Sequence, residues 1–247
     1  MDFKKLNTIG GWTAFLIALV TYTLTVEPTA SFWDCGEFIA CAFKLQVPHP
    51  AGAPFFLLLG RLASLFAGGN VEKVALMINM LSVLASAFTI LFMYWTISLL
   101  GRKILDTKGE DLSSSQQILI LGSSLVGALA YTWSDSFWFS AVEAEVYGMS
   151  SFFTAIVIWA VLKWELIENE AAGNKWLIFI AYLVGLSIGV HLLNLVTIPA
   201  LGLWVYYKKT SKVSLKGVIL SILIGLVVLG VIMVGVITGI PTLSFSF

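Results

Sequence analysis

The segment from Trp33 to Pro54 carries residues that could do chemistry between strongly apolar stretches. Asp34 and Glu37 are three residues apart, so a helix starting near Asp34 places both carboxylates on one face, with Cβ atoms about 5–6 Å apart. Two acids at one place can take a proton from a hydroxyl or hold a divalent cation. The same spacing is also typical of a helix capping box, and this alternative stays open.

Prolines downstream of the two acids constrain how the chain continues. The run Pro48-His49-Pro50 predicts the end of the first helix, and Pro54 is suited to start a second helix. The resulting turn is expected to bring the imidazole of His49 back toward the carboxylates. Lys44 lies two helical turns beyond Glu37.

The composition identifies an all-α, multi-pass membrane protein. Of the 247 residues, 59% are hydrophobic and 11% are charged, whereas soluble domains carry about 25% charged residues. Basic and acidic residues are balanced at 14 each, so no basic surplus indicates a nucleic-acid partner. Cys35 and Cys41 are separated by about 9 Å of helical rise, too far for an undistorted disulfide. The cysteines and histidines show no metal-ligand spacing.

Hydropathy predicts about seven membrane-spanning helices in one transmembrane domain, 1–247, which we interpret as the N-terminal membrane portion of a longer protein. The first apolar block follows Lys4 and Lys5 and lacks a small-residue cleavage site, so we expect a retained anchor with a cytoplasmic N-terminus. The expected spans are Ile9–Val26, Val74–Leu100, Ile118–Trp133, Tyr147–Leu166, Trp176–Val190, Leu192–Tyr207 and Leu215–Thr238.

The segment Ala53–Ala67 decides the topology. It is short for a span and is interrupted by Arg61. If it crossed, the cations of the loop 102–117 would face outside, against the positive-inside rule. We therefore expect 34–45 and 53–67 to form two juxtamembrane helices on the outer side.

This topology brings three polar clusters to the outer side. The first cluster holds Asp34, Glu37 and His49, and the others follow at 138–147 and 191–194. Acids near lipid usually face a cavity and mark a site. Each cluster also has a structural alternative: Glu143 can be a solvated loop charge, Asp135 an ordinary helix cap, and His191 with Asn194 hydrogen-bonded packing between two short helices. Trp133, Trp138 and Tyr147 fit an aromatic wall or, by default, an interfacial belt.

The sequence resembles a bacterial family of multi-pass membrane proteins of formerly unknown function. That family is related to eukaryotic protein O-mannosyltransferases and, more distantly, to the GT-C glycosyltransferase superfamily. The resemblance covers nearly the whole chain and is carried by three motifs: Trp33-Asp34-Cys35-Gly36-Glu37-Phe38…Val47-Pro48-His49-Pro50-Ala51-Gly52-Ala53-Pro54, Ala144-Glu145-Val146-Tyr147 and Gly189-Val190-His191. Ala51 departs from the family pattern, which often has a proline there. Family members are usually longer than this chain.

The resemblance implies a GT-C-like enzyme that transfers a sugar from a polyprenyl-phosphate carrier to an acceptor, with a protein hydroxyl preferred over a glycan. Its expected place is the bacterial inner membrane, with the site facing the periplasm. No metal is required, although the acids could hold a divalent cation. Asp34 is the expected base and Glu37 its catalytic partner. The expected substrate-binding residues are Lys44, His49, Arg61, Glu145, Tyr147, His191 and Asn194.

Two other classes of function remain open from sequence. An ion-coupled transporter also uses intramembrane acids and histidines, although transporters usually show inverted repeats and sites at the midplane. We find no repeat here. A membrane scaffold for envelope assembly is the other alternative.

Overall fold

The computed structural model describes residues 2–50, 52–105 and 112–244, and the described chain is helical without strands. Ala51 of the motif and 106–111 of the expected cytoplasmic loop lie outside the described residues. The prediction of an all-α helical bundle is confirmed. The α-helices are α1 (Phe3–Leu24), α2 (Cys35–Lys44), α3 (Pro54–Leu65), α4 (Val74–Leu105), α5 (Ser114–Thr132), α6 (Asp135–Ala141), α7 (Val146–Glu165), α8 (Glu170–Ile188), α9 (Thr197–Lys209), α10 (Leu215–Val231) and α11 (Ile240–Ser244).

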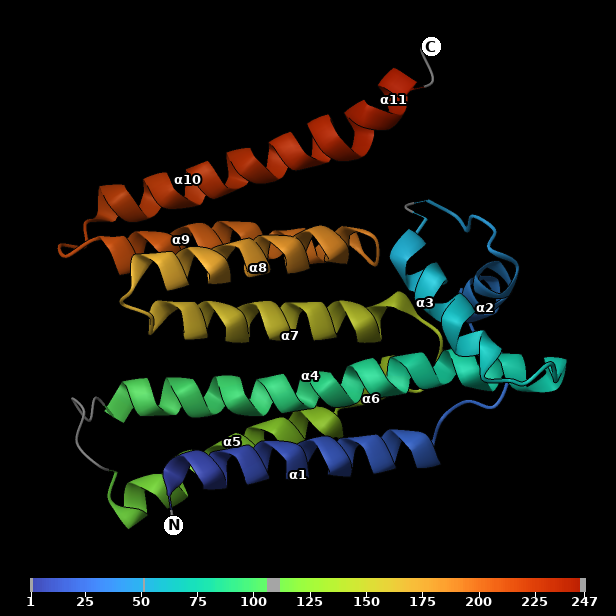
Figure 1. Ribbon diagram of the computed structural model, residues 1–247, viewed down its shortest axis with the longest axis horizontal. Coiled ribbons are helices and arrows are strands. Elements are labelled where there is room, and N and C mark those ends of the chain that lie inside the picture. Colours follow the sequence, from blue (N-terminus) through green and yellow to red (C-terminus); the bar gives the residue numbers. More distant parts are fainter. Residues whose placement is uncertain (1, 51, 106–111, 245–247) are drawn as a thin grey trace.

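The long helices run side by side, and α2 and α3 lie together at one end of the bundle (Figure 1). In the described chain, five helices are long and apolar enough to cross a membrane, and the bent pair α5–α6 can form a sixth span across its 68° bend. The segment expected as a span over 192–207 is divided between a 3₁₀ turn, η2 (Leu192–Val196), and the 13-residue α9. These helices make the chain a multi-pass membrane protein.

Helix α4 is the central support of the fold. With the preceding 3₁₀ turn η1 (Val71–Lys73) it extends over 35 residues and packs against α1, α5 and α7. Its buried face includes small and hydroxyl side chains such as Ser82 and Ser86, which allow close helix approach in a membrane. At Gly148 of α7 an added Cβ would lie 2.8 Å from the Ser86 Oγ, so this crossing requires glycine.

The short helices α2 and α3 form a hairpin that is fastened to the bundle. Gly60 allows their close packing, because a Cβ there would lie 2.9 Å from the Cβ of Ala42. The backbone amides of Phe55 and Phe56 both donate to the carbonyl of Gly189, at 2.7 and 3.2 Å. Twelve residues of α3 rise about 18 Å, less than the roughly 30 Å of the hydrocarbon core. This length agrees with the expectation that 53–67 does not cross.

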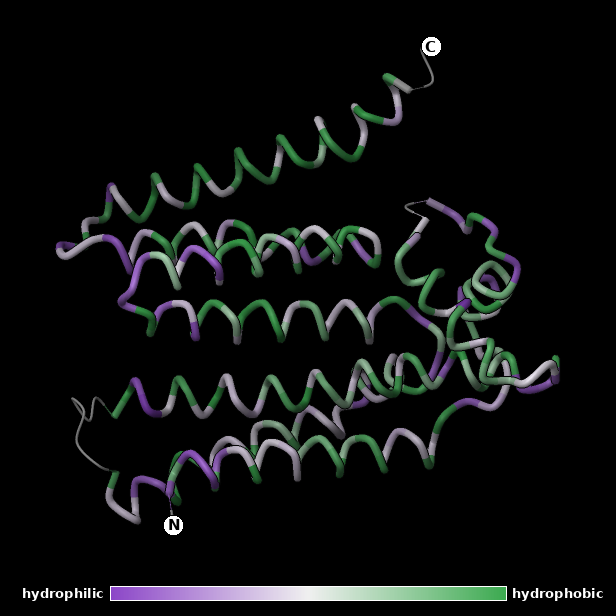
Figure 2. Tube along the Cα trace, in the orientation of Figure 1, coloured by the Kyte–Doolittle hydropathy of each residue, from purple (hydrophilic) through white to green (hydrophobic). Residues whose placement is uncertain are grey.

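Polar residues collect at the two ends of the bundle, and the spans between them are apolar (Figure 2). We call the end that carries α2, α3 and the start of α7 the site end. The opposite end, called the basic end, carries the start of α1 and the ends of α4, α7 and α9, and its cations include Lys4, Arg102, Lys103, Lys163 and Lys208.

Candidate functional site

Asp34 immediately precedes α2 but does not cap it. Its side chain makes no capping hydrogen bond, and its backbone is already in the right-handed helical region. Trp33, directly before it, has a left-handed backbone with φ of 67°, which is unusual for a bulky residue and is found most often where function fixes the chain. The carboxylate of Asp34 is therefore available for another partner.

Glu37 holds His49 by two hydrogen bonds. Its Oε1 accepts from the backbone N–H of His49 at 2.7 Å, and its Oε2 lies 2.8 Å from the Nδ1 of the same residue. The other ring nitrogen, Nε2, lies 3.9 Å from Oδ2 of Asp34. The hydrogen bond to Glu37 raises the pKa of His49, and the same contact lowers the pKa of Glu37. The expected return of His49 toward the two acids is thus observed.

Glu145 is a buried carboxylate at the start of α7. It is 4% exposed, and its Oε1 has no hydrogen-bond partner among the described residues. Burial raises its pKa to about 7, with further contributions from the nearby charges of Glu143 and Asp34. An acid with this pKa can exchange a proton near neutral pH.

Glu143 lies beneath this carboxylate and is 2% exposed. It accepts a hydrogen bond from the hydroxyl of Ser31, and burial raises its pKa. Sequence analysis treated Glu143 as a possible solvated loop charge, and the structure instead buries it. Its contact with Ser31 joins the α6–α7 connection to the segment that leads to Asp34.

Asn79 of α4 is a positioning residue that the sequence analysis missed. It is fully buried, and its Nδ2 donates to the carbonyl oxygens of Glu27 at 2.6 Å and Thr29 at 3.0 Å. These bonds fasten the segment that delivers Asp34 to the central helix. A single asparagine within the apolar α4 was the available signal, since buried amides require partners.

Five of the predicted site residues line one cavity of about 130 Å³ at the site end. The Tyr147 ring lies against that of His191, with centroids 5.3 Å apart. The Nδ1 of His191 accepts from the backbone N–H of Leu193 at 3.2 Å, so a neutral His191 carries its proton on Nε2. Burial lowers the pKa of His191, which favours this neutral form. The five residues are Asp34, His49, Glu145, Tyr147 and His191.

The other predicted site residues lie elsewhere. Lys44 is exposed in the last turn of α2. Arg61 donates to the carbonyl oxygen of Phe43 at 2.8 Å and covers its ring, so it satisfies the end of α2. Asn194 is buried and accepts from Thr154 of α7 at 2.5 Å, which is packing between helices. Glu37 does not line the cavity but reaches it through His49.

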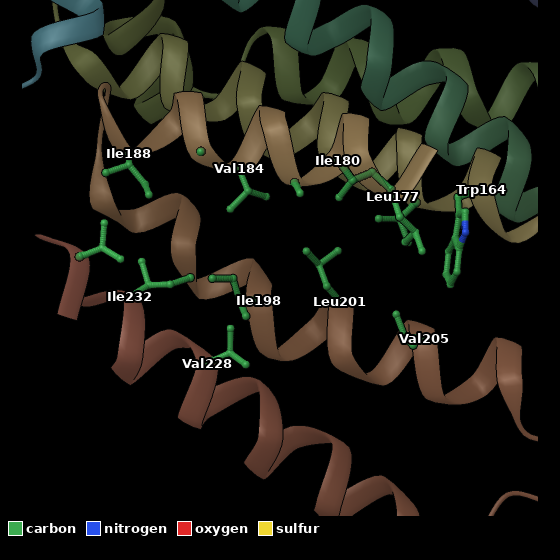
Figure 3. Close-up of a pocket in the computed structure, with 14 residues that line it drawn as sticks. Trp164, Leu177, Ile180, Val184, Ile188, Ile198, Leu201, Val205, Val228 and Ile232 are labelled. Atoms are coloured by element: carbon green, nitrogen blue, oxygen red, sulfur yellow. The ribbon is translucent and has the colours of Figure 1, made fainter. Parts of the chain in front are cut away.

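An apolar groove of about 400 Å³ adjoins the cavity, because Ile188 lines both. Helices α7 and α8 form one side of the groove, and α9, α10 and the π-helical segment η3 (Ile232–Gly239) form the other. Figure 3 places Ile188 and Trp164 at opposite ends of the groove. The polar cavity and the apolar groove thus share Ile188 as a wall residue.

Comparisons with known proteins identify the family of the chain. Residues 34–214 match the family described as "Protein O-mannosyl-transferase TMEM260 N-terminal domain". The chain is 26% identical over 195 residues to protein O-mannosyl-transferase tmem260 of Dictyostelium discoideum, covering 75% of this chain and 22% of that protein. It is 28% identical over 190 residues to protein O-mannosyl-transferase TMEM260 of Mus musculus, covering 76% of this chain and 24% of that protein.

No solved structure matches the chain significantly. The chain spans about a quarter of the length of each of the two curated relatives. The family match includes α2, the loop before α3, the start of α7 and His191, all of which contribute residues to the cavity wall. The chain therefore belongs to the family of the protein O-mannosyl-transferase TMEM260 N-terminal domain.

Proposed function

We propose that this chain is the catalytic membrane portion of a glycosyltransferase that moves a sugar from a polyprenyl-phosphate donor to a hydroxyl of a protein acceptor. The observation that carries the proposal is that Ile188 lines both a cavity with carboxylates and imidazoles and an apolar groove. A lipid-linked sugar has the matching shape, with one polar end and one long hydrocarbon end. The relatives' names support mannose as the sugar.

The groove suits the hydrocarbon part of such a donor. Its side chains are aliphatic apart from Trp164, and it runs between helices at membrane depth. Filling it with an isoprenoid chain would remove apolar surface from contact with other lipid while holding the phosphate near Ile188. The sugar would then lie among the polar side chains of the cavity.

The proposed transfer needs one proton acceptor. The acceptor hydroxyl gives its proton to a carboxylate as its oxygen bonds to the sugar C1. The bond between C1 and the phosphate oxygen breaks, and the polyprenyl phosphate leaves with the electron pair. A neutral His191 can donate its Nε2 proton in a hydrogen bond to that leaving oxygen.

Among the two acids that line the cavity, we assign proton acceptance to Glu145 rather than to the initially expected Asp34. Glu145 is buried and has an unpartnered oxygen, so a substrate hydroxyl would satisfy it. Asp34 faces His49 instead. Glu37, expected to be the catalytic partner of Asp34, bonds to His49 instead, and we assign it the orientation of the His49 ring.

The charge distribution supports a site on the outer face of the membrane, and we propose that this membrane is a bacterial inner membrane. The basic end gathers cations from four helices, and such ends face the cytoplasm by the positive-inside rule. The cavity lies at the opposite end and would then face the periplasm. A protein acceptor would reach it there after export.

The test is sugar transfer in membranes that contain the chain, with mannose-labelled polyprenyl phosphate and a serine- or threonine-rich peptide. Glu145→Gln keeps the shape and removes the base, so transfer should fall by about 10²–10⁴-fold. Glu72→Gln changes an exposed acid in η1 and should leave transfer unchanged. Normal transfer by Glu145→Gln would refute the assigned base. Solute uptake into sealed vesicles without any sugar transfer would instead identify a transporter.

A further inference from the structure

The acids in and around the cavity give it negative charge, which would oppose the binding of a phosphate. Asp34 and Glu145 line it, and Glu37 and Glu143 lie directly behind them. No lysine or arginine lines it in the described part of the chain, since Lys44 and Arg61 lie elsewhere. An anionic donor would therefore meet an anionic cavity, and unscreened like charges at short range repel strongly. In the described lining His49 can carry a positive charge, but Glu37 already pairs with it, so a further cation would favour binding of the donor.

The geometry around His49 suits a metal ion. When His49 is neutral and its Nδ1 donates to Glu37, the lone pair of Nε2 is free, and an ion bound there would replace the proton of the imidazolium form. Hydrogen bonding by a carboxylate orients metal-ligating histidines in this way. Nε2 lies 3.9 Å from Oδ2 of Asp34. Two ligands at about 2.1 Å from one tetrahedral ion lie about 3.4 Å apart, so a small side-chain rotation would bring these two atoms to the separation that an ion needs.

A second observation points to a bound cation in the same cavity. The carboxylate of Glu145 is buried, and its Oε1 has no partner among the described residues. Backbone N–H groups of Val146 and Asp34 accompany this carboxylate, but Oε1 remains an open acceptor, and a water bound to an ion in the cavity could donate to it. Oxygen atoms of Asp34 and Glu37 and a ring nitrogen of His49 also lie within 4.8 Å of one another.

We propose that Asp34 Oδ2 and His49 Nε2 bind one divalent transition-metal ion, of the Mn²⁺ or Zn²⁺ class, with Glu37 orienting the imidazole. A ligand set that mixes imidazole and carboxylate suits these ions better than Mg²⁺ or Ca²⁺, which prefer oxygen. The ion's remaining positions would bind the donor phosphate, a role that rests on the proposed function. This arrangement also separates two tasks: Asp34 holds the ion, and Glu145 accepts the proton.

The alternative is that the Glu37–His49 pair only fastens the loop after α2. Titration of the purified chain in lipid nanodiscs with Mn²⁺, followed by electron paramagnetic resonance, distinguishes the two. We expect saturation at one ion per chain without any donor. Asp34→Asn and His49→Gln should abolish saturable binding, and Glu37→Gln should weaken it about 10–100-fold.

Two controls make the result specific. Glu72→Gln removes an exposed acid near the same end and should bind Mn²⁺ like the unchanged chain. Glu145→Gln should retain the ion within a few fold while losing sugar transfer. Each variant must keep the helical circular dichroism and the thermal transition of the parent chain.

Absence of saturable Mn²⁺ and Zn²⁺ binding in the folded parent would overturn the proposal, as would unchanged binding by Asp34→Asn or His49→Gln. Because the titration contains no sugar donor, its failure leaves the glycosyltransferase assignment standing. Conversely, a chain that binds Mn²⁺ but transfers no sugar under any condition would contradict the proposed function and not the metal site.

Discussion

The carboxylate of Glu37 contacts His49 twice: Oε1 accepts from the backbone N–H at 2.7 Å, and Oε2 lies 2.8 Å from Nδ1 of the ring. The two contacts fix the loop after α2 and turn the free ring nitrogen toward Asp34. A carboxylate twelve residues away in sequence thus determines where the imidazole points. Both side chains are partly exposed, so the loop depends on these bonds rather than on burial.

Removing the two contacts between Glu37 and His49 should make the loop after α2 more mobile without unfolding the bundle. In Glu37→Ala the backbone N–H of His49 loses its acceptor, and its hydrogen exchange should accelerate at least about tenfold, since a hydrogen bond to a charged group contributes about 1.5–3 kcal/mol. Hydrogen exchange with mass spectrometry on peptides covering 45–50 measures this. Glu72→Ala serves as the matched control. Unchanged exchange in Glu37→Ala would show that the loop is held by other contacts.

The buried carboxylate of Glu145 should make stability depend on pH. Its pKa is raised to about 7 in the folded chain, compared with 4.5 when unperturbed. The folded chain therefore keeps a proton that the unfolded chain loses, and the contribution to stability is full below about pH 4.5 and is lost as pH rises through about 7. Glu145→Gln should abolish this loss, on the order of 1–3 kcal/mol.

Thermal unfolding in detergent with a metal chelator, at pH 5 and pH 8, measures the effect. The Tm of the parent chain should fall between the two values by more than that of Glu145→Gln. Parallel behaviour of the two proteins would show that Glu145 does not keep its proton in the folded state.

Asn79 should matter for stability although it lies outside the cavity. In Asn79→Ala the carbonyl oxygens of Glu27 and Thr29 lose a buried donor, at a cost of about 1–3 kcal/mol. Thr96→Val in the same helix is the control, because the Thr96 hydroxyl has no partner among the described residues, and this change should be neutral or stabilising. Thermal unfolding of both variants provides the comparison. Equal stability of Asn79→Ala and the parent would remove Asn79 as a support of the site.

Blocking the apolar groove should affect donor binding more than chemistry. Val184 lines the groove, and Val184→Trp would fill part of its roughly 400 Å³. We expect KM for the lipid-linked donor to rise about tenfold or more while kcat changes little, since the reacting groups are untouched. Leu223→Trp, at an exposed position on α10, is the matched control. A KM unaffected by Val184→Trp would place the hydrocarbon chain elsewhere.

The topology can be tested by labelling. Ser114 begins α5 at the basic end, and Gln46 is exposed at the site end. With Cys35 and Cys41 replaced, a membrane-impermeant thiol reagent applied to the periplasmic side should modify Gln46→Cys and not Ser114→Cys. The reverse pattern would place the cavity in the cytoplasm and contradict the outer-face assignment.

The sequence by itself determined the class of protein and the clustering of the cavity acids. Hydropathy identifies the helices that are apolar enough to cross a membrane, and the placement of lysines and arginines distinguishes the cytoplasmic end of the bundle from the outer end. Once the spans alternate, Asp34, Glu145 and His191 must lie at the same end, so their association followed from topology. The motif around His49 added a turn whose prolines return the chain.

Only the tertiary structure decided which of these side chains meet. Lys44, Arg61 and Asn194 lie at that end too, but the rotation of each helix about its axis turns them away from the cavity. Asn79 stands out in the sequence as an amide within an apolar helix, but the sequence does not indicate its hydrogen-bond partners. Its acceptors are backbone carbonyls about fifty residues away. Hydropathy is a property of segments, whereas side-chain direction depends on the packing of α2, α3 and α7 against α4, which no local pattern contains.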